Sequence, residues 1–207
     1  REAIEAGVMH QTSNGVFGSV GVRSDKQQGQ ATAYTPYPAA PGFQGSRTDV
    51  AASVGYRFTP APAQAEQGEA KQKRGTPWAL SVFGQKTIDR DGGRLENDRV
   101  GVAGELQPTS RLTLAGEVSD GDLGTGANVK ANYATGERGS LYLAYALAAE
   151  NPDAFTTGRL GRVTAGARRR IGTSTNVFAE GRYEHGSGPT GFTQAYGADF
   201  TPIPGWT

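Results

Sequence analysis

The chain has 207 residues, of which 36% are hydrophobic, 31 are glycine and none is cysteine. This length suggests one domain or at most two, and the lack of thiols excludes a disulfide scaffold, a thiolate metal site and a cysteine nucleophile. The formal charge of +1 is too balanced for a protein that neutralises many phosphates, so we expect no nucleic-acid partner. The sequence contains no run of about 18 apolar residues, so it predicts no membrane-spanning helix.

Apolar and polar residues alternate along most of the chain, which is typical of strands with one apolar and one polar face. In chain order the alternation predicts eleven strands, at Ile4–His10, Val16–Arg23, Val50–Phe58, Trp78–Lys86, Val100–Leu106, Leu112–Val118, Asn128–Tyr133, Leu141–Leu147, Val163–Ile171, Val177–Tyr183 and Phe192–Phe200. A twelfth strand would begin at Trp206. We therefore predict an all-β protein, an antiparallel up-and-down transmembrane β-barrel of about twelve strands, with the chain truncated before the last.

The connections between these strands alternate in length, as in bacterial outer-membrane barrels with short periplasmic turns and longer outer loops. The short ones include Gln11–Gly15, Gln107–Arg111 and Gly172–Thr175, and the longer ones include Ser24–Asp49, Ile88–Asp98 and Glu150–Arg162. The stretch at about 59–77 is long on the short-turn side and rich in Pro, Ala, Gln and charge. We expect a flexible insertion there, within one barrel domain that spans residues 1–207.

The polar sides of the predicted strands carry most of the charge. If the apolar side meets lipid, the residues that line the interior are Arg23, Arg57, Glu105, Glu117, Lys130, Arg168, Arg170, Glu180, Arg182, Glu184 and Asp199. A Lys or Arg that faces lipid at mid-membrane costs on the order of 2–4 kcal/mol, and only Lys86 and Arg169 fall on the apolar side, both near predicted strand ends. The interior charges nearly balance, which predicts weak ion selectivity.

Aromatic residues gather at the ends of the predicted strands, on their apolar side. Such residues form girdles at the two membrane interfaces, because an amphipathic ring favours the headgroup level. Beside the short turns lie Phe58, Trp78, Tyr133, Phe200 and Trp206, and at the opposite ends lie Tyr183 and Phe192.

The stretch from about Trp78 to Trp206 resembles a proteobacterial outer-membrane β-barrel of the porin-like kind. Two phrases, Arg138–Tyr145 and Gly186–Phe192, resemble the C-terminal barrel of large, repeat-bearing surface proteins. The resemblance implies a location in the bacterial outer membrane, with membrane lipid as a partner. It also implies that other chains or a missing segment complete the barrel.

Few residues suggest catalysis or metal binding. His10 and His185 lie far apart without a metal-ligand spacing, and Asp89-Arg90-Asp91-Gly92 lacks the full calcium-loop signature, so we predict no metal, no cofactor and no catalytic constellation. The Arg168-Arg169-Arg170 run is not interpreted as one patch, since alternate strand residues face opposite ways. The predicted function is a passive channel or the membrane anchor of a larger surface protein. The alternatives are an outer-membrane barrel enzyme (a lipid hydrolase or protease) and a soluble β-rich adhesion or structural module.

Overall fold

The computed structural model describes residues 2–27, 45–60, 75–148, 159–186 and 190–201. Their regular elements are the strands β1 (Glu2–Gln11), β2 (Val16–Gln27), β3 (Gly45–Phe58), β4 (Trp78–Gly92), β5 (Arg99–Thr109), β6 (Leu112–Gly121), β7 (Gly126–Gly136), β8 (Gly139–Ala148), β9 (Leu160–Ile171), β10 (Thr175–Gly186) and β11 (Gly191–Phe200). All eleven predicted strands are confirmed, and each is longer than its alternation alone suggested. Most of the predicted insertion at 59–77, and the predicted twelfth strand at Trp206, lie outside the described residues. Across the described ranges, no helix has the length and apolar character that crossing a membrane requires.

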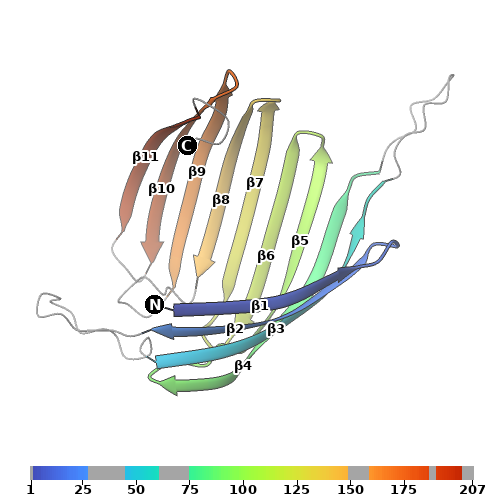
Figure 1. The fold of residues 1–207 in the computed structure, drawn as a ribbon, viewed down its shortest axis with the longest axis vertical. Coiled ribbons are helices and arrows are strands. Elements are labelled where there is room, and N and C mark those ends of the chain that lie inside the picture. The colour runs from blue at the N-terminus through green and yellow to red at the C-terminus, as the bar shows by residue number, and fades with distance from the viewer. Residues whose placement is uncertain (1, 28–44, 61–74, 149–158, 187–189, 202–207) are drawn as a thin grey trace, which may run out of the picture.

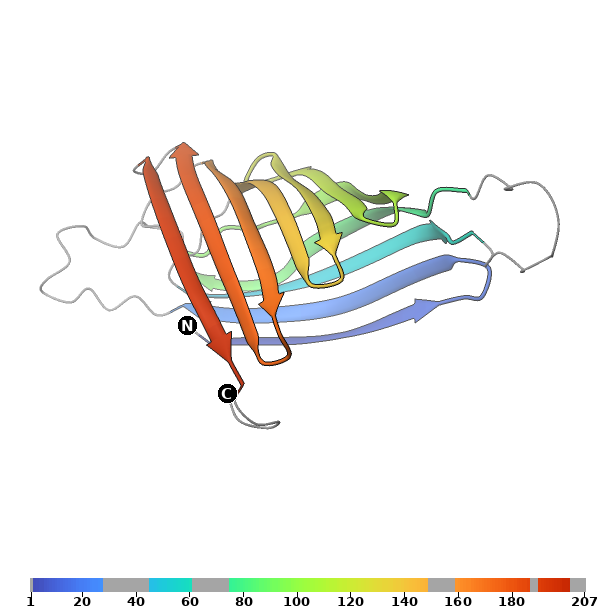
Figure 2. The same ribbon diagram turned by 90° about the horizontal axis from the view of Figure 1, so that it is seen from above.

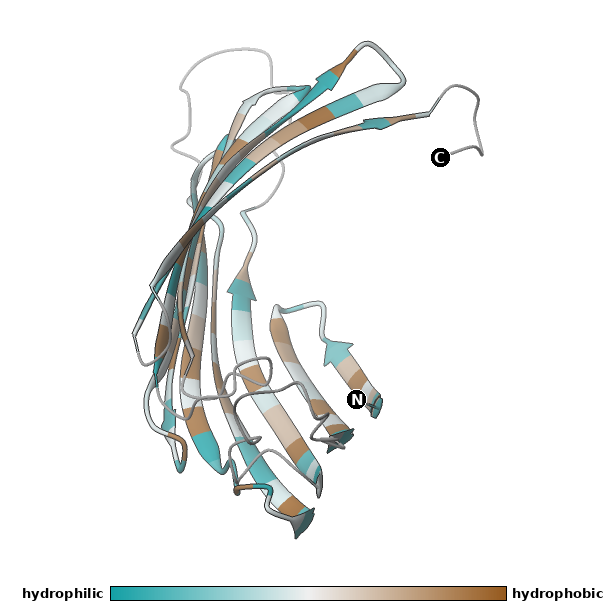
Figure 3. Ribbon diagram, turned by 90° about the vertical axis from the view of Figure 1, so that its left-hand side faces the viewer, coloured by the Kyte–Doolittle hydropathy of each residue, from teal (hydrophilic) through white to brown (hydrophobic). Residues whose placement is uncertain are grey.

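The strands form one sheet in strict sequence order, each antiparallel to the one before it. Figures 1 and 2 show this sheet bent around a hollow, with β1 at one edge and β11 at the other. In Figure 3 the bend is that of an open trough. Within the described residues β1 and β11 pair only with β2 and β10, so the sheet is not closed into a ring.

One face of the sheet is apolar across its whole width. The cross-strand register places Val54, Val82, Val102 and Val118 side by side on four neighbouring strands, and further rows of valine, leucine, alanine and aromatic residues run parallel to this one. The alternation of hydropathy along each strand is visible in Figure 3. No hydrophobic side chain of the described residues is buried, whereas Ile4, Val8 and Leu143 are more than half exposed. The fold therefore has no apolar core of the kind that stabilises a water-soluble domain.

The opposite face is polar and lies on the inner side of the trough, because the hollows of the structure are lined by its side chains. The buried side chains of the described residues are all polar or charged: Asp25, Arg47, Asp49, Arg94 and Ser119. This arrangement inverts the usual distribution, in which hydrophobic residues are the ones most often buried, and the buried charges are paired, as burial requires.

The β3–β4 pair projects beyond the apolar rows. A register shift between Thr48 and Asp49 marks a β-bulge, and β4 continues to Gly92. Lys86 lies on the apolar face, opposite Val50, as predicted. It is not near the end of its strand, however, because β4 continues past the bulge, where Ile88 is the extra residue, for six more residues along β3. Its charge is met by Asp98, whose Oδ2 lies 2.9 Å from Nζ.

Aromatic rings on the polar face lie over glycines of the next strand. The register pairs Phe17 with Gly55, Phe83 with Gly101, Tyr142 with Gly166 and Phe178 with Gly197. In each pair a Cβ on the glycine would collide with the ring. The rings therefore lie flat along the wall and leave the middle of the trough open.

Candidate functional site

The eleven residues predicted to line an interior all share the polar face of the sheet. Arg23 stands opposite Glu5 and Asp49, for example, and Glu180 stands opposite Gly166 and Ala195. The same register places Arg57, Glu105, Glu117, Lys130, Arg168, Arg170, Arg182, Glu184 and Asp199 on this face. That this face lines a pore stays a prediction.

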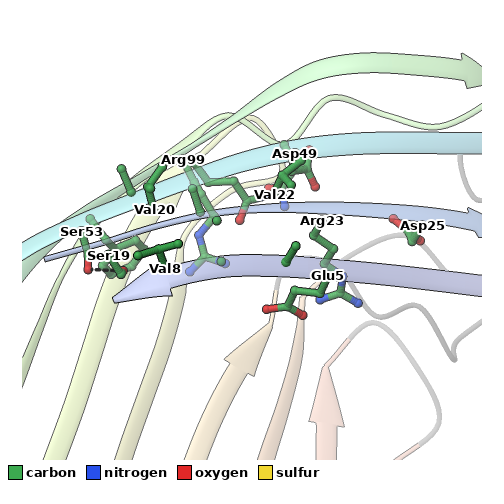
Figure 4. A pocket seen from close by; sticks show the side chains of 18 of the residues that line it. Glu5, Val8, Ser19, Val20, Val22, Arg23, Asp25, Asp49, Ser53 and Arg99 are labelled. Carbon is green, nitrogen blue, oxygen red and sulfur yellow. Dashed lines mark hydrogen bonds between the residues drawn. The ribbon is translucent and has the colours of Figure 1, made fainter. Parts of the chain in front are cut away.

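A cavity of about 690 Å³ occupies the trough near the longer loops, over β1 to β5. Figure 4 shows its charged lining, with Glu5, Arg23 and Asp49 on adjacent strands and Asp25 further along β2. The Ser19 and Ser53 hydroxyls are 2.7 Å apart across β2 and β3. Val8, Val20 and Val22 also line the cavity, so it combines charged groups and hydroxyls with an apolar part.

The loop of residues 93–98 folds into this cavity from the β4–β5 connection. It begins after Gly92, whose φ of 71° is a left-handed conformation that glycine adopts without strain and that lets the chain turn out of β4. Arg94 is only 1% exposed. Its Nη2 donates to both carboxylate oxygens of Asp25 on β2, at 3.0 and 2.9 Å. The loop therefore reaches over β3 and is fixed to β2 by a buried, charge-assisted contact.

A second set of contacts holds the same loop to β3 and β4. Arg47 donates through Nε to Asp49 Oδ2 at 2.9 Å and through Nη1 to the Leu95 carbonyl at 3.2 Å. Asp49 Oδ1 accepts a hydrogen bond from the Thr87 hydroxyl at 2.7 Å, and that hydroxyl accepts one from the Asn97 amide at 2.9 Å. Two charges and two loop residues are thus joined in one continuous network.

The far end of the loop is held at the surface. The Thr87 amide and the Lys86 ammonium donate to the two oxygens of Asp98, at 2.7 and 2.9 Å. The Lys86 hydrogen bond, followed by that of Thr87, lowers the pKa of Asp98 below its ordinary value of 3.8. Glu96 pairs with Arg90 at 3.1 Å, where both side chains are exposed.

Sequence reasoning missed most of this cavity. Asp25, Arg47, Asp49 and Arg99 were assigned to loops because the predicted strands began too late or ended too early. Continuing the two-residue period of β3 backward from Ala51 would have placed Asp49 and Arg47 on the polar face. Arg94 belongs to an irregular loop, and no periodic pattern could have indicated that it folds inward.

Paired charges also cover the rest of the polar face. Arg99 bonds Glu117 at 2.9 Å and Arg162 bonds Glu184 at 2.7 Å. The Tyr142 hydroxyl donates to Glu180 at 2.5 Å, and Arg182 lies 3.3 Å from the same carboxylate. The guanidinium groups of Arg57 and Arg99 lie over the rings of Phe17 and Phe83, at 5.7 and 5.5 Å. Such contacts fix long side chains against the wall.

The structure changes the predicted charge balance. Arg90 and Glu96, which pair at the projecting end of β4, are left aside, as is Asp98, which pairs with Lys86 of the apolar face. Otherwise the described polar face and its inward loop carry ten basic and eight acidic residues. The basic ones are Arg23, Arg47, Arg57, Arg94, Arg99, Lys130, Arg162, Arg168, Arg170 and Arg182, and the acidic ones are Glu5, Asp25, Asp49, Glu105, Glu117, Glu180, Glu184 and Asp199. The sequence-based set held six and five, so the structure adds a small positive excess.

The predicted girdle aromatics lie on the apolar face where they are described. Phe58 and Trp78 are directly opposite each other, with ring centroids 6.3 Å apart, and Tyr133 is opposite Leu141. Phe200 ends β11 on the same rim. Tyr183 and Phe192 are paired near the other rim. Trp206 lies outside the described residues, and the assignment of these rings to membrane interfaces stays a prediction.

The two histidines lie on the apolar face, opposite Gly18 and Gly161. His185 stacks between Tyr145 and Tyr183, with centroid distances of 6.1 and 5.9 Å. In the described ranges neither histidine hydrogen-bonds a serine or a carboxylate, and no three His, Asp or Glu side chains gather as metal ligands. The polar face thus contributes charge pairs and hydroxyls without histidine.

Comparison with known proteins gives matches to solved structures alone, since no family model and no curated protein matches the chain. One similar structure is the KdgM porin, with 11% identity over 96% of this chain and 91% of that chain and a TM-score of 0.44. The KdgM porin in complex with disordered oligogalacturonate has 12% identity over the same shares and a TM-score of 0.45. A mutant of the Rh. blastica porin has 13% identity over 98% of this chain and 81% of that chain, with a TM-score of 0.43.

Proposed function

We propose that this chain spans the bacterial outer membrane as the wall of a β-barrel, and that its trough is the lumen of a passive channel for small hydrophilic solutes. The observation that carries the proposal is the exposed apolar face, which extends over the sheet while no described hydrophobic residue is buried. Exposed apolar patches beyond a few hundred Å² mark surfaces that are covered in the working protein. Lipid fits a face whose rows of side chains are mostly apolar across the width of the sheet.

The length of the strands supports the same proposal. The shortest have ten residues, about 33 Å of extended chain. At the tilt of about 40° usual in outer-membrane barrels, this spans the apolar band of about 25 Å. Every strand is therefore long enough to cross the membrane.

The inward loop of residues 93–98 narrows this lumen. It brings Arg94 next to Asp25 and stands over Arg47 and Asp49. A solute must pass these charges, and they are held in place by their own pairs. We therefore assign the narrowest part of the channel to the loop and to the walls of β2, β3 and β5.

The two edges of the sheet restrict how the barrel is closed. With eleven strands in antiparallel order, β1 and β11 run in the same direction. An odd number of further strands, such as one, would give every strand antiparallel neighbours and pair the backbone N–H and C=O groups of both edges. Another chain or another segment would supply them. Membrane lipid is the other partner that we propose.

The remaining functions predict different behaviour. A membrane anchor would share the apolar face but conduct no ions. A barrel enzyme would need a nucleophile in contact with a base. In the described residues neither histidine is hydrogen-bonded to a side chain that could act as the nucleophile. A soluble adhesion or structural module would have to cover the apolar face with protein.

The test combines fractionation with electrical recording. We expect the protein to partition with outer membranes, to show heat-modifiable mobility on a gel, and to conduct in planar bilayers with a modest preference for anions, measured as the reversal potential in a salt gradient. Outer-membrane location without conductance would remove the channel and leave the anchor. Stable solubility of the refolded chain without detergent would remove both.

A further inference from the structure

A second hollow lies at the rim formed by the short turns, and its lining is strongly basic. This cavity of about 580 Å³ is lined by Arg138, on the turn between β7 and β8, and by Arg168, Arg169 and Arg170 at the end of β9. Ser140, Asn176 and Phe178 complete much of the wall, and the acidic members of the lining are Glu137 and Asp199. Four arginines and two acidic residues therefore line the cavity, so basic residues predominate in it.

No ion pair within 4.0 Å joins these four arginines to a carboxylate in the part of the chain that the structure describes. Glu180 attracts Arg168 from further away, and the side-chain contacts of Arg170 and Arg168 are to the Thr173 carbonyl, at 2.6 Å, and to Tyr142. The rim of the longer loops differs, because there Arg47, Arg94, Arg99 and Arg162 each pair with a carboxylate. The fold thus pairs its arginines directly at one rim and leaves these four without a direct ion pair at the other.

The backbone keeps these arginines together. The Arg170 amide donates to the Arg138 carbonyl at 2.7 Å, so the turn and the strand end are directly joined. Arg168 stands opposite Ser140, and Arg170 stands opposite Asn176, which gives further donors on the same side. Arg169 points to the other side of β9, but at the strand end it still contributes to the cavity lining. The alternation of the arginine run is therefore as expected, with Arg168 and Arg170 on one face, and the basic character of the hollow comes from Arg138 joining this pair.

We propose that this rim is a binding site for a phosphate-bearing ligand. Concentrated like charges oppose folding unless an anion accompanies them. Arginine presents a planar fork of donors that matches phosphate oxygens in pairs. A phosphate group supplies negative charge together with several acceptor oxygens, whereas chloride supplies charge without oxygens that a guanidinium fork can bind in pairs.

The phosphate group has two sources at this position. If the channel is oriented with its short turns toward the periplasm, the rim lies at the level of the inner-leaflet headgroups and also at the mouth of the lumen. A lipid phosphate would reach the cavity from the membrane, and a phosphorylated solute would reach it from the lumen.

The experiment measures binding of inorganic phosphate to the folded protein in a neutral detergent, by titration calorimetry at constant ionic strength, with chloride as the reference anion. We expect saturable phosphate binding that weakens about tenfold or more in the Arg168→Gln/Arg170→Gln double variant, since two charge-assisted donors are lost. Arg138→Gln, on an exposed turn where folding is not at risk, gives a second and smaller loss. Arg111→Gln, a matched arginine on another turn of the same rim, keeps the wild-type affinity.

Unchanged phosphate binding in both cavity variants, or equal competition by chloride, would overturn the site. Repeating the titration in nanodiscs identifies the source of the ligand. Loss of inorganic phosphate binding in discs with phosphatidylglycerol, but not in discs of phosphatidylcholine alone, assigns the site to lipid. Retained binding in both assigns it to a solute. None of these measurements depends on conductance, so the site and the channel can fail separately.

Discussion

Replacing Asp25 by asparagine tests whether the loop of residues 93–98 is held in the trough by its buried ion pair. Asp25 and Arg94 have side chains that are 4% and 1% exposed and that meet through two hydrogen bonds. The variant keeps the size of the side chain and removes its charge. The guanidinium then remains in a buried position without its carboxylate, and it regains water only if the loop leaves the trough.

The size of the effect follows from that burial. Removing one partner of a buried ion pair costs about 3–5 kcal/mol. We take the lower end, about 3 kcal/mol, because the amide oxygen still accepts one hydrogen bond from Arg94. Since 1.4 kcal/mol corresponds to a factor of ten, the population of the released loop should rise about a hundredfold.

Trypsin cleavage after Arg94 reports that population, because the bond is accessible only when the loop swings out. We expect the cleavage rate at this one site, followed by mass spectrometry of the detergent-folded protein, to rise about a hundredfold in Asp25→Asn. The Glu96→Gln variant of the same loop is the matched control. It removes an exposed pair worth about 1 kcal/mol or less, so its rate should stay within a few fold of wild type. An unchanged rate in Asp25→Asn would refute the assignment of the ion pair as the anchor of the loop.

Three further predictions concern the wall and the loop. Leu143→Arg, in the middle of the apolar face, should lower the free energy of unfolding in lipid vesicles by about 2–4 kcal/mol, whereas Ala144→Arg, one residue on and facing the trough, should be tolerated; equal losses would contradict the assignment of the faces. Gly55→Ala places a Cβ 2.5 Å from the Phe17 ring and 2.6 Å from the Leu80 carbonyl, so urea titration should show a loss of about 1–3 kcal/mol. Gly116→Ala, whose nearest neighbour is 3.6 Å away, is its control and should change little. The pKa of Asp98 is lowered in the folded protein. Its contact with Lys86 therefore contributes its full stabilisation above the ordinary carboxyl pKa, and this stabilisation is lost as the pH falls through the lowered pKa. A carboxyl NMR titration midpoint at or above 3.8 would contradict this.

The strands and their faces could be predicted because lipid and water impose a simple rule on a spanning sheet. A one-residue slip would turn Leu141, Leu143 and Leu147 into the trough and their charged neighbours into lipid, so the alternation specifies the register strongly. The strand ends are less determined. On the Gly45 side of Val50 the outward residues Ser46 and Thr48 are polar and the inward Arg47 and Asp49 are buried charges, so the apolar signal stops while the strand continues to Gly45.

The inward loop could not be predicted for a different reason. Arg94 and Asp25 are 69 residues apart in the chain, and nothing in either local sequence indicates the other. The contact exists because the bulge at Thr48/Asp49 and the turn at Gly92 direct the β4–β5 connection over the trough. Such pairing depends on the completed sheet, since only the sheet brings β2 beneath the loop.

The contacts of the loop also imply that the width of the lumen and the stability of the sheet can be changed separately. Its described hydrogen bonds reach β2, β3 and β4, and at Asp98 they also reach Asp122, which follows β6. Apart from that last contact, the ladders that join β1 to β11 do not involve the loop. The aromatic rings lie flat against glycines, so no ring has to move when the loop leaves. Loss of the Asp25–Arg94 pair should therefore widen the lumen while the sheet keeps its unfolding transition, because the same ladders and the same apolar face remain in place.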